Sequence, residues 1–183
     1  MYERAGSAAD AATVVFVHGA MDRGASFLKA TRHLAGLDLV RYDRRGYGRS
    51  LGAGVAIDVD AHVEDLLTVV GERSPVTVVG HSFGGVIALV AADRAPDRIG
   101  SLLVYEPPTP WLPAWPQGTG GGRSVAAAAR DGAAAGAEVF MRAVAGDHVW
   151  ERLPEATRAA RRAEGPALIA ELTAIRTLSS APF

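Results

Sequence analysis

A serine framed by glycines, in the stretch GHSFGG at residues 80–85, is the strongest chemical signal of the sequence. The stretch PVTVVG before it is apolar and β-branched, which predicts a buried strand, and FGGVIALVAADRAP after it predicts a helix that ends before Pro96. A sharp turn from strand to helix lifts such a serine above the edge of a sheet, where its hydroxyl can attack an acyl carbon. We therefore predict that Ser82 is a catalytic nucleophile, and the alternative is a glycine-rich turn with an incidental serine.

The neighbours of this serine meet the other demands of acyl transfer. Gly80 and Gly84 leave room where side chains would collide across the turn. The backbone N–H of Phe83 is expected at the start of the helix, where it lacks a helical acceptor and can bind the negatively charged oxygen of the reaction intermediate. The side chain of His81 is expected to point away from the hydroxyl, as a structural or pocket-lining residue.

The elements that must position this turn alternate between strands and helices. Besides PVTVVG, the apolar run TVVFV predicts a strand that is buried on both faces. LDLVRYD predicts another apolar strand, and SLLVYE predicts the last one. Helices are expected at about 26–34 and 58–72, and in the second of these His62 is expected to face away from the apolar side. The alternation predicts an α/β fold with a parallel sheet and right-handed crossovers.

The character of the chain changes after Glu106. Residues 107–122 are rich in Pro, Trp and Gly and predict a connection, whereas residues 123–183 predict a helical region. Residues 1–106 are therefore expected to form the α/β core. Breaks in the helical region are expected at Gly146, at Pro154 and at the pair Gly165 and Pro166.

Together the motifs resemble those of the α/β-hydrolase family. VFVHGA at residues 15–20 resembles the family's His-Gly segment at the end of its third strand, YDRRGYGRS at 42–50 the loop after its fourth, and GHSFGG the turn after its fifth. The helical region resembles the cap that many members insert after the sixth strand. The resemblance implies hydrolysis of a small ester, thioester or amide by acyl transfer, without a cofactor or a metal.

The resemblance also implies roles for residues near the nucleophile. The N–H of Ala20 would be the second oxyanion donor beside that of Phe83, and His18 with Gly19 would support the loop that carries it. Asp43 ends a predicted strand, and a local turn-stabilising role with its two arginine neighbours is expected rather than a role as catalytic acid.

A serine hydrolase of this family needs an acid and then a histidine after the nucleophile in the chain. Glu106 ends the last predicted strand at the carboxyl edge of the sheet and is a candidate acid, with a structural carboxylate as the alternative. His148 is the only histidine after Ser82, and an exposed position at a helix start competes with a role as general base. We expect the family's histidine and its seventh and eighth strands to be missing from this chain, which would make the fold incomplete and impair activity. A non-catalytic binding or regulatory protein is the alternative function.

Composition and charge exclude several other classes of protein. The formal net charge of -1 over 183 residues provides no basic surface for nucleic acid or for an anionic membrane, and the absence of cysteine excludes disulfides and thiolate metal sites. No apolar run approaches the roughly 20 residues of a membrane span, and the first residues do not resemble a signal peptide. We expect a cytoplasmic protein with a small-molecule substrate, which associates with itself through the uncovered edge of the SLLVYE strand.

Overall fold

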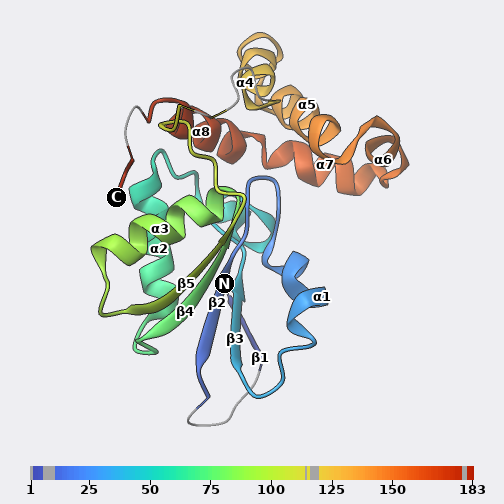
Figure 1. Cartoon of the computed structure of the whole chain (residues 1–183). Helices are drawn as coiled ribbons and strands as arrows, with labels where there is room; N and C mark the ends of the chain where they lie inside the picture. Colours follow the sequence, from blue (N-terminus) through green and yellow to red (C-terminus); the bar gives the residue numbers. More distant parts are fainter. Residues whose placement is uncertain (1, 6–10, 114, 116–119, 179–180) are drawn as a thin grey trace. The chain divides into compact units, whose positions relative to one another are not determined.

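The computed structural model describes residues 2–5, 11–113, 115, 120–178 and 181–183 (Figure 1). The chain groups into two compact units. One unit consists of Met1–Arg44, Asp58–Pro108 and Pro182–Phe183, and the other of Arg45–Ile57 and Thr109–Ala181. The division expected from the sequence, after residues 106 and 122, stays a prediction. The grouping of Arg45–Ile57 with the helical part was not foreseen.

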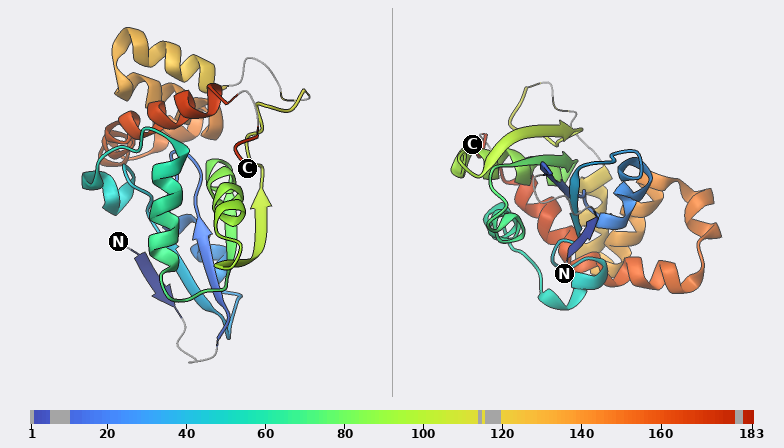
Figure 2. Two further views of the ribbon diagram at one scale, coloured as in Figure 1. Left: turned by 90° about the vertical axis from the view of Figure 1, so that its left-hand side faces the viewer. Right: turned by 90° about the horizontal axis from the view of Figure 1, so that it is seen from below.

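The first unit is built around a five-stranded sheet with the strand order β1-β3-β2-β4-β5 (Figure 2). Four of its strands are parallel, as the apolar runs predicted, namely β2 (Thr13–Val17), β3 (Asp38–Tyr42), β4 (Val76–His81) and β5 (Ile99–Tyr105). The remaining strand, β1 (Tyr2–Ala5), pairs antiparallel with β3. It was not predicted, because YERA mixes charged and apolar residues without a strand pattern.

Burial along the strands follows their place in the sheet. β2 and β3, in the middle of the sheet, are buried over their whole length, and β4 alternates between buried and partly buried residues. Most residues of β5 are exposed, since β4 is its only neighbour among the described strands. Within the described part of the chain, β1 and β5 therefore form the two edges of the sheet.

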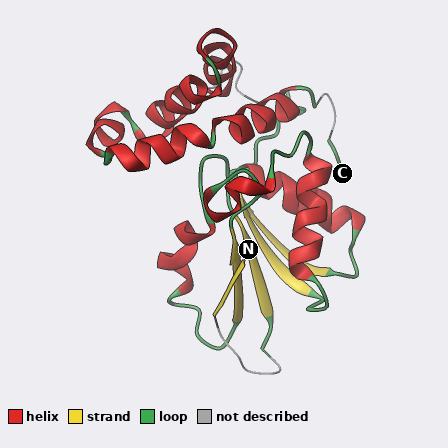
Figure 3. Cartoon of the chain, turned by 180° about the vertical axis from the view of Figure 1, so that it is seen from behind, coloured by secondary structure: helices red, strands yellow, loops and turns green. Residues whose placement is uncertain are grey.

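Helices cover both faces of this sheet (Figures 1 and 3). α2 (Val59–Val70) and α3 (Phe83–Arg94) pack against each other on one face, and α1 (Leu28–Thr31) lies on the other face with the short 3-10 helix η1 (Gly24–Phe27). α2 begins where the side chain of Asp58 accepts a hydrogen bond from the N–H of Ala61 over 2.9 Å. α3 ends at Arg94, before Pro96, as predicted.

One expectation about α2 was wrong. His62 faces the core, because only 2% of its surface is exposed and its ring meets the ring of Phe83 edge-on, with the centroids 5.5 Å apart. The reason is that α3 packs along this side of α2. A position that looks polar in the sequence is therefore covered by an aromatic side chain.

The described residues of the second unit form five α-helices and one 3-10 helix. These are η2 (Gly48–Ala53), α4 (Gly120–Asp131), α5 (Ala133–Ala145), α6 (Asp147–Arg152), α7 (Glu155–Ala163) and α8 (Gly165–Arg176). The predicted breaks at Gly146 and Pro154 are confirmed, and the third break falls at Glu164. A break at Gly132, where φ is 89°, was missed because the surrounding alanines are good helix formers. Among the described helices, none combines the length and the apolar character that crossing a membrane requires.

Buried polar contacts tie the segment Arg45–Ile57 to the helices of the second unit. The hydroxyl of Tyr47 donates to the carboxylate of Glu171 on α8 over 2.9 Å. The N–H of Gly48 donates to the carboxylate of Glu164, the residue before α8, over 2.9 Å. Both carboxylates and the tyrosine are almost fully buried. The loop after β3 therefore helps to complete the core of the helical unit.

Candidate active site

Ser82 lies between β4 and α3 in a conformation that serine rarely adopts. Its φ is 51° and its ψ is -123°, a left-handed region that costs a residue other than glycine about 1–3 kcal/mol. Backbone hydrogen bonds hold the turn on both sides. The N–H of Ser82 donates to the carbonyl oxygen of Tyr105 over 2.8 Å, and its carbonyl oxygen accepts from the N–H of Gly85 over 2.8 Å. The turn is therefore fixed by the neighbouring strand, and Ser82 stays partly accessible.

Two glycines allow the close packing of this turn. A Cβ on Gly80 would lie 2.5 Å from the carbonyl oxygen of Gly84, and a Cβ on Gly84 would overlap the carbonyl oxygen of Val17 in β2. A flexible side chain could rotate away from an added Cβ, but these backbone atoms cannot. A larger residue at either position would therefore displace the neighbouring backbone.

The loop that follows β2 lies against the nucleophile turn. A Cβ on Gly19 would lie 3.0 Å from the Cβ of Ser82 and 3.3 Å from Nδ1 of His81. Ala20 comes next in this loop, and Phe83 begins α3 with an N–H that has no helical acceptor. The structure thus places Ala20 and Phe83 on the two segments that meet at the serine.

Arg44 and His18 hold this loop from inside the protein. His18 is fully buried, its Nε2 accepts from the backbone N–H of Arg44 over 2.9 Å, and its Nδ1 lies 2.8 Å from the carbonyl oxygen of Gly19. Nδ1 therefore carries the proton, which makes the ring neutral and engages both of its nitrogens. The guanidinium of Arg44 donates to the carbonyl oxygens of His18, over 2.9 Å, and Gly19, over 3.0 Å. It also lies 5.2 Å from the centre of the Phe83 ring.

His81 lies beside the same loop. Its ring stacks on that of Tyr105 with the centroids 5.5 Å apart, and its Nδ1 is 3.9 Å from a carboxylate oxygen of Asp22. Asp22 in turn accepts a hydrogen bond from the hydroxyl of Ser26. Within the described residues, no hydrogen bond joins the His81 ring to Ser82. A third of the His81 side chain, 33%, is exposed, which suits a residue that lines the approach to the nucleophile.

Three residues in these contacts were missed by sequence reasoning. Asp22 and Tyr105 reach the His81 ring only because their segments flank the end of β4, and local sequence patterns do not reveal strand order. Arg44 was expected only in a turn with Asp43, and the carboxylate of Asp43 also accepts a hydrogen bond from the N–H of Gly24 over 2.9 Å. The available signal for Arg44 was its place just beyond a buried strand, where a charged side chain needs acceptors inside the protein.

Among the described residues, neither the candidate acid Glu106 nor the candidate base His148 is hydrogen-bonded to Ser82. Glu106 is exposed and follows β5 with a φ of 52°, one residue beyond the Tyr105 carbonyl that accepts from Ser82. His148 lies on α6 in the second unit, and its exposed ring accepts a hydrogen bond from Arg152 over 3.3 Å. Among the described residues, neither Ser82 nor Glu106 has a hydrogen bond to a histidine. The same residues contain no cluster of His, Asp and Glu that could hold a metal ion.

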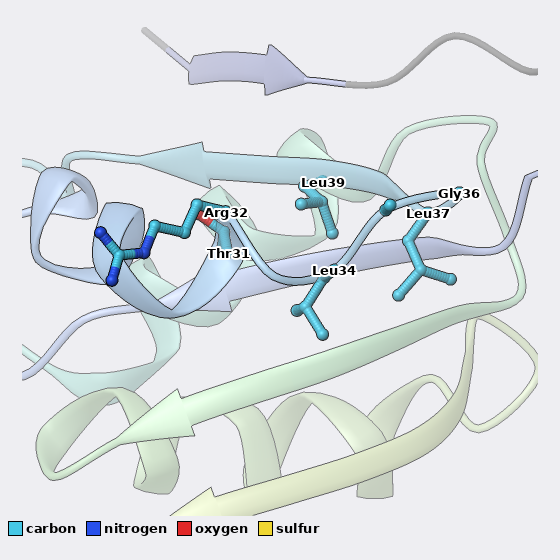
Figure 4. A pocket seen from close by; sticks show the side chains of 7 residues that line it. Thr31, Arg32, Leu34, Gly36, Leu37 and Leu39 are labelled. Carbon is cyan, nitrogen blue, oxygen red and sulfur yellow. The ribbon is translucent and has the colours of Figure 1, made fainter.

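A hollow of about 240 Å³ opens elsewhere on the first unit (Figure 4). Its walls come from the end of α1 and the segment that leads into β3, with Thr31, Arg32, Leu34, Gly36, Leu37 and Leu39. β3 begins there, whereas Ser82 follows the carboxyl end of β4, which is parallel to β3 within the sheet. The hollow is therefore at the opposite end of the sheet from the nucleophile, and it is not part of this site.

Known proteins that resemble this chain include lipases and a carboxylesterase. A model of the alpha/beta hydrolase family matches residues 14–181. The chain is 34% identical over 98 residues to lipase LipV of Mycobacterium tuberculosis, and 32% identical over 104 residues to the human monoglyceride lipase. These matches cover 52% and 51% of this chain but only 37% and 34% of the two relatives. A carboxylesterase structure from Nitrososphaera gargenis shares the fold, with a TM-score of 0.69 at 21% identity over 100% of this chain and 70% of that one.

Proposed function

Because the chain belongs to the alpha/beta hydrolase family, we propose that it is built to transfer the acyl group of a small carboxylic ester to water through Ser82. The observation that carries this proposal is the backbone of Ser82, which has a positive φ at the turn from a parallel strand into a helix. Such strain persists only where the surrounding structure enforces it, and it is typical of functional positions. The names of the matched relatives, two lipases and a carboxylesterase, favour an ester over an amide or a thioester.

The backbone N–H groups of Ala20 and Phe83 form the oxyanion hole in this proposal. When the serine oxygen bonds to the acyl carbon, the carbonyl oxygen gains a negative charge that these two groups would stabilise. Peptide geometry supports the role of Ala20. The carbonyl oxygen of Gly19 is held by Arg44 and His18, and in a trans peptide the following N–H points the opposite way.

The attacking serine also needs a base, and this requirement limits the activity of the 183-residue chain. A serine hydroxyl is a weak nucleophile at neutral pH until a neighbouring group takes its proton. In serine hydrolases, loss of the histidine costs about 10⁶ in turnover, while the oxyanion hole and binding retain about 10³–10⁴ over the uncatalysed reaction. Glu106 is the proposed acid, because it directly follows Tyr105, whose carbonyl oxygen accepts a hydrogen bond from the N–H of Ser82. The proposed activity of this chain is therefore slow.

A fluorophosphonate probe tests the proposal, because it reacts with a serine whose hydroxyl is activated as a nucleophile. We expect slow labelling at a single site, which peptide mass spectrometry locates at Ser82, and no labelling of Ser82→Ala. Ser74→Ala removes an exposed serine in the loop before β4, at the other end of that strand, and serves as the matched control, with labelling unchanged.

The alternative is a binding or regulatory protein that keeps the hydrolase fold without its chemistry. The observation that favours it is that, among the described residues, no histidine is hydrogen-bonded to Ser82. A folded chain that takes up no probe at Ser82 over a day would support this alternative and would refute the proposed nucleophile.

A further inference from the structure

A buried histidine on α2 contacts two groups of the candidate active site. Only 2% of the surface of His62 is exposed. Its ring meets the ring of Phe83 edge-on, with the centroids 5.5 Å apart. Its Nε2 lies 3.5 Å from Nη1 of Arg44. His62 therefore lies beside both the residue that begins α3 and the cation that holds the loop after β2.

The three nitrogens of the Arg44 guanidinium face three different groups. Nε donates to the carbonyl oxygen of His18 over 2.9 Å, and Nη2 donates to that of Gly19 over 3.0 Å. Nη1 faces the ring of His62. Because the guanidinium is planar and its N–H groups form a rigid fork, one orientation serves all three contacts at once. The contact with His62 thus opposes a rotation that would release the two carbonyl oxygens.

This contact also determines which nitrogen of His62 carries the proton. A guanidinium can only donate hydrogen bonds, so Nε2 is the acceptor, and Nδ1 carries the proton of a neutral ring. A protonated ring would direct an N–H and a second positive charge at a buried cation, since only 1% of the surface of Arg44 is exposed. The free electron pair on Nε2 is therefore the feature of His62 that Arg44 requires.

The two contacts of His62 lead to the two proposed oxyanion donors by separate routes. Arg44 holds the carbonyl oxygen of Gly19, and the same peptide group contains the N–H of Ala20. Phe83 supplies the second N–H, and its ring packs against the ring of His62 and lies 5.2 Å from the guanidinium of Arg44. One side chain on α2 thus contacts the groups that support both donors.

We propose that His62 is a positioning residue of the oxyanion hole. Its Nε2 orients the guanidinium of Arg44, which in turn orients the N–H of Ala20 toward the oxygen that becomes negatively charged. This inference rests on the proposed function, in which Ser82 is the nucleophile and Ala20 is an oxyanion donor. If His62 served packing alone, the shape of its ring would matter and the acceptor at Nε2 would not.

Two substitutions separate the acceptor from the ring. His62→Phe keeps a flat ring beside Phe83 but removes the acceptor, whereas His62→Gln loses the ring and can place its amide oxygen near the position of Nε2. His33→Phe is the matched control, because Nε2 of the exposed His33 also accepts a hydrogen bond from an arginine, Arg32, over 2.9 Å. If His62→Phe does not fold, His62→Asn replaces it, since its amide is one carbon shorter and does not reach Nη1 of Arg44.

Nuclear magnetic resonance measures the effect on the loop without requiring any reaction at Ser82. In the nitrogen-15-labelled chain, His62→Phe should shift the signals of the Arg44 Nε–H and of the Ala20 amide, and the Arg44 proton should exchange faster with water. His62→Gln should return both signals toward their positions in the unaltered chain, and His33→Phe should not move them. Signals that stay in place in His62→Phe would overturn the proposal, whether or not Ser82 reacts.

The rate of fluorophosphonate labelling at Ser82 connects this contact to the nucleophile, at a temperature where circular dichroism shows every variant folded. Direct loss of one oxyanion donor costs about 10²–10³, so His62→Phe should react about tenfold more slowly than the unaltered chain, and His62→Gln within about threefold of it. Equal slowing in both variants would mean that the ring matters and the acceptor does not, which overturns the proposal. An unaltered chain without labelling refutes the proposed nucleophile instead, and the resonance signals then decide whether His62 positions the loop.

Discussion

Arg44 donates a hydrogen bond from its guanidinium to the carbonyl oxygen of Gly19 over 3.0 Å, and Gly19 packs against the Cβ of Ser82. A buried cation thereby sets the orientation of the peptide group between Gly19 and Ala20. The N–H at the other end of that peptide is the proposed oxyanion donor, so Arg44 is expected to act on Ser82 without touching it.

Replacement of Arg44 by lysine should slow the reaction of Ser82 with a fluorophosphonate. A lysine keeps the charge but cannot make the separate hydrogen bonds to His18 and Gly19 that the planar guanidinium makes. Direct loss of one oxyanion donor costs about 10²–10³, so an indirect loss of orientation should cost about tenfold or more. Arg94→Lys, at an exposed ion pair with Asp60, should react at the unaltered rate. Equal rates for both variants would show that Arg44 has no positioning role.

Hydrolysis of p-nitrophenyl acetate by the purified chain should be only a trace activity. Because no described residue offers Ser82 a hydrogen-bonded base, we expect the remaining rate to come from water attack at the oxyanion hole and to change little in Ser82→Ala. Initial rates of the two proteins at equal concentration provide the comparison. Robust turnover that disappears in Ser82→Ala would reveal an unconventional base, and His148→Ala would then be the first variant to measure.

Ser82→Gly should stabilise the protein, whereas Ser82→Ala should not. Glycine adopts the conformation with φ of 51° without strain, so the substitution should remove a strain of about 1–3 kcal/mol from the folded protein. The greater conformational freedom of glycine in the unfolded chain opposes this gain by about 0.5–1 kcal/mol. Alanine keeps the Cβ that causes the strain. Urea denaturation of the three proteins measures the difference, and a glycine variant that is less stable than the alanine variant would contradict the expected strain.

Gly84→Ala should destabilise or unfold the first unit. The added Cβ would overlap the backbone carbonyl of Val17 in β2, and such overpacking costs about 1–3 kcal/mol, occasionally more. Gly52→Ala is the matched control, because a Cβ at Gly52 meets no atom within 4 Å and the residue is not in a left-handed conformation. The control should change the free energy of unfolding by less than about 1 kcal/mol.

Glu138 should make the helical unit sensitive to acid. Burial acts to raise its pKa, but hydrogen bonds from Arg162 and Arg142 outweigh this effect and hold the pKa below its ordinary value of 4.5. A carboxyl whose pKa is lowered by folding contributes stability above its unfolded pKa, and this contribution is lost as the pH falls through the folded pKa. Glu138→Gln should therefore be slightly less stable than the unaltered chain at neutral pH, by less than about 1 kcal/mol.

The pH dependence of the stability difference between Glu138→Gln and the unaltered chain tests whether the carboxylate charge is responsible. The difference in melting temperature between the variant and the unaltered chain should shrink below about pH 4.5 and approach zero at still lower pH. Glu151→Gln, which removes a more exposed partner of Arg142, should show a smaller effect at every pH. A difference that does not depend on pH would mean that the carboxylate charge is not involved.

The features that could be predicted from the sequence are those that local patterns determine. Four parallel strands, the helix after Ser82 and the tight turn at Gly80 and Gly84 all follow from apolar runs and glycine positions. The rest depends on which elements become neighbours. His62 is buried because α3 packs on α2, and the stacking of His81 on Tyr105 requires β5 to lie beside β4.

The hydrogen bonds from Tyr47 to Glu171 and from Gly48 to Glu164 join residues that are 124 and 116 positions apart in the chain. A piece of the helical unit is thus encoded within the sheet unit. Recombination between relatives is constrained by this arrangement, since exchanging Thr109–Ala181 alone would bury acceptor carboxylates against a foreign loop that need not supply their donors. The helical unit can be moved intact only as two separate stretches of gene, with Arg45–Ile57 as the smaller one.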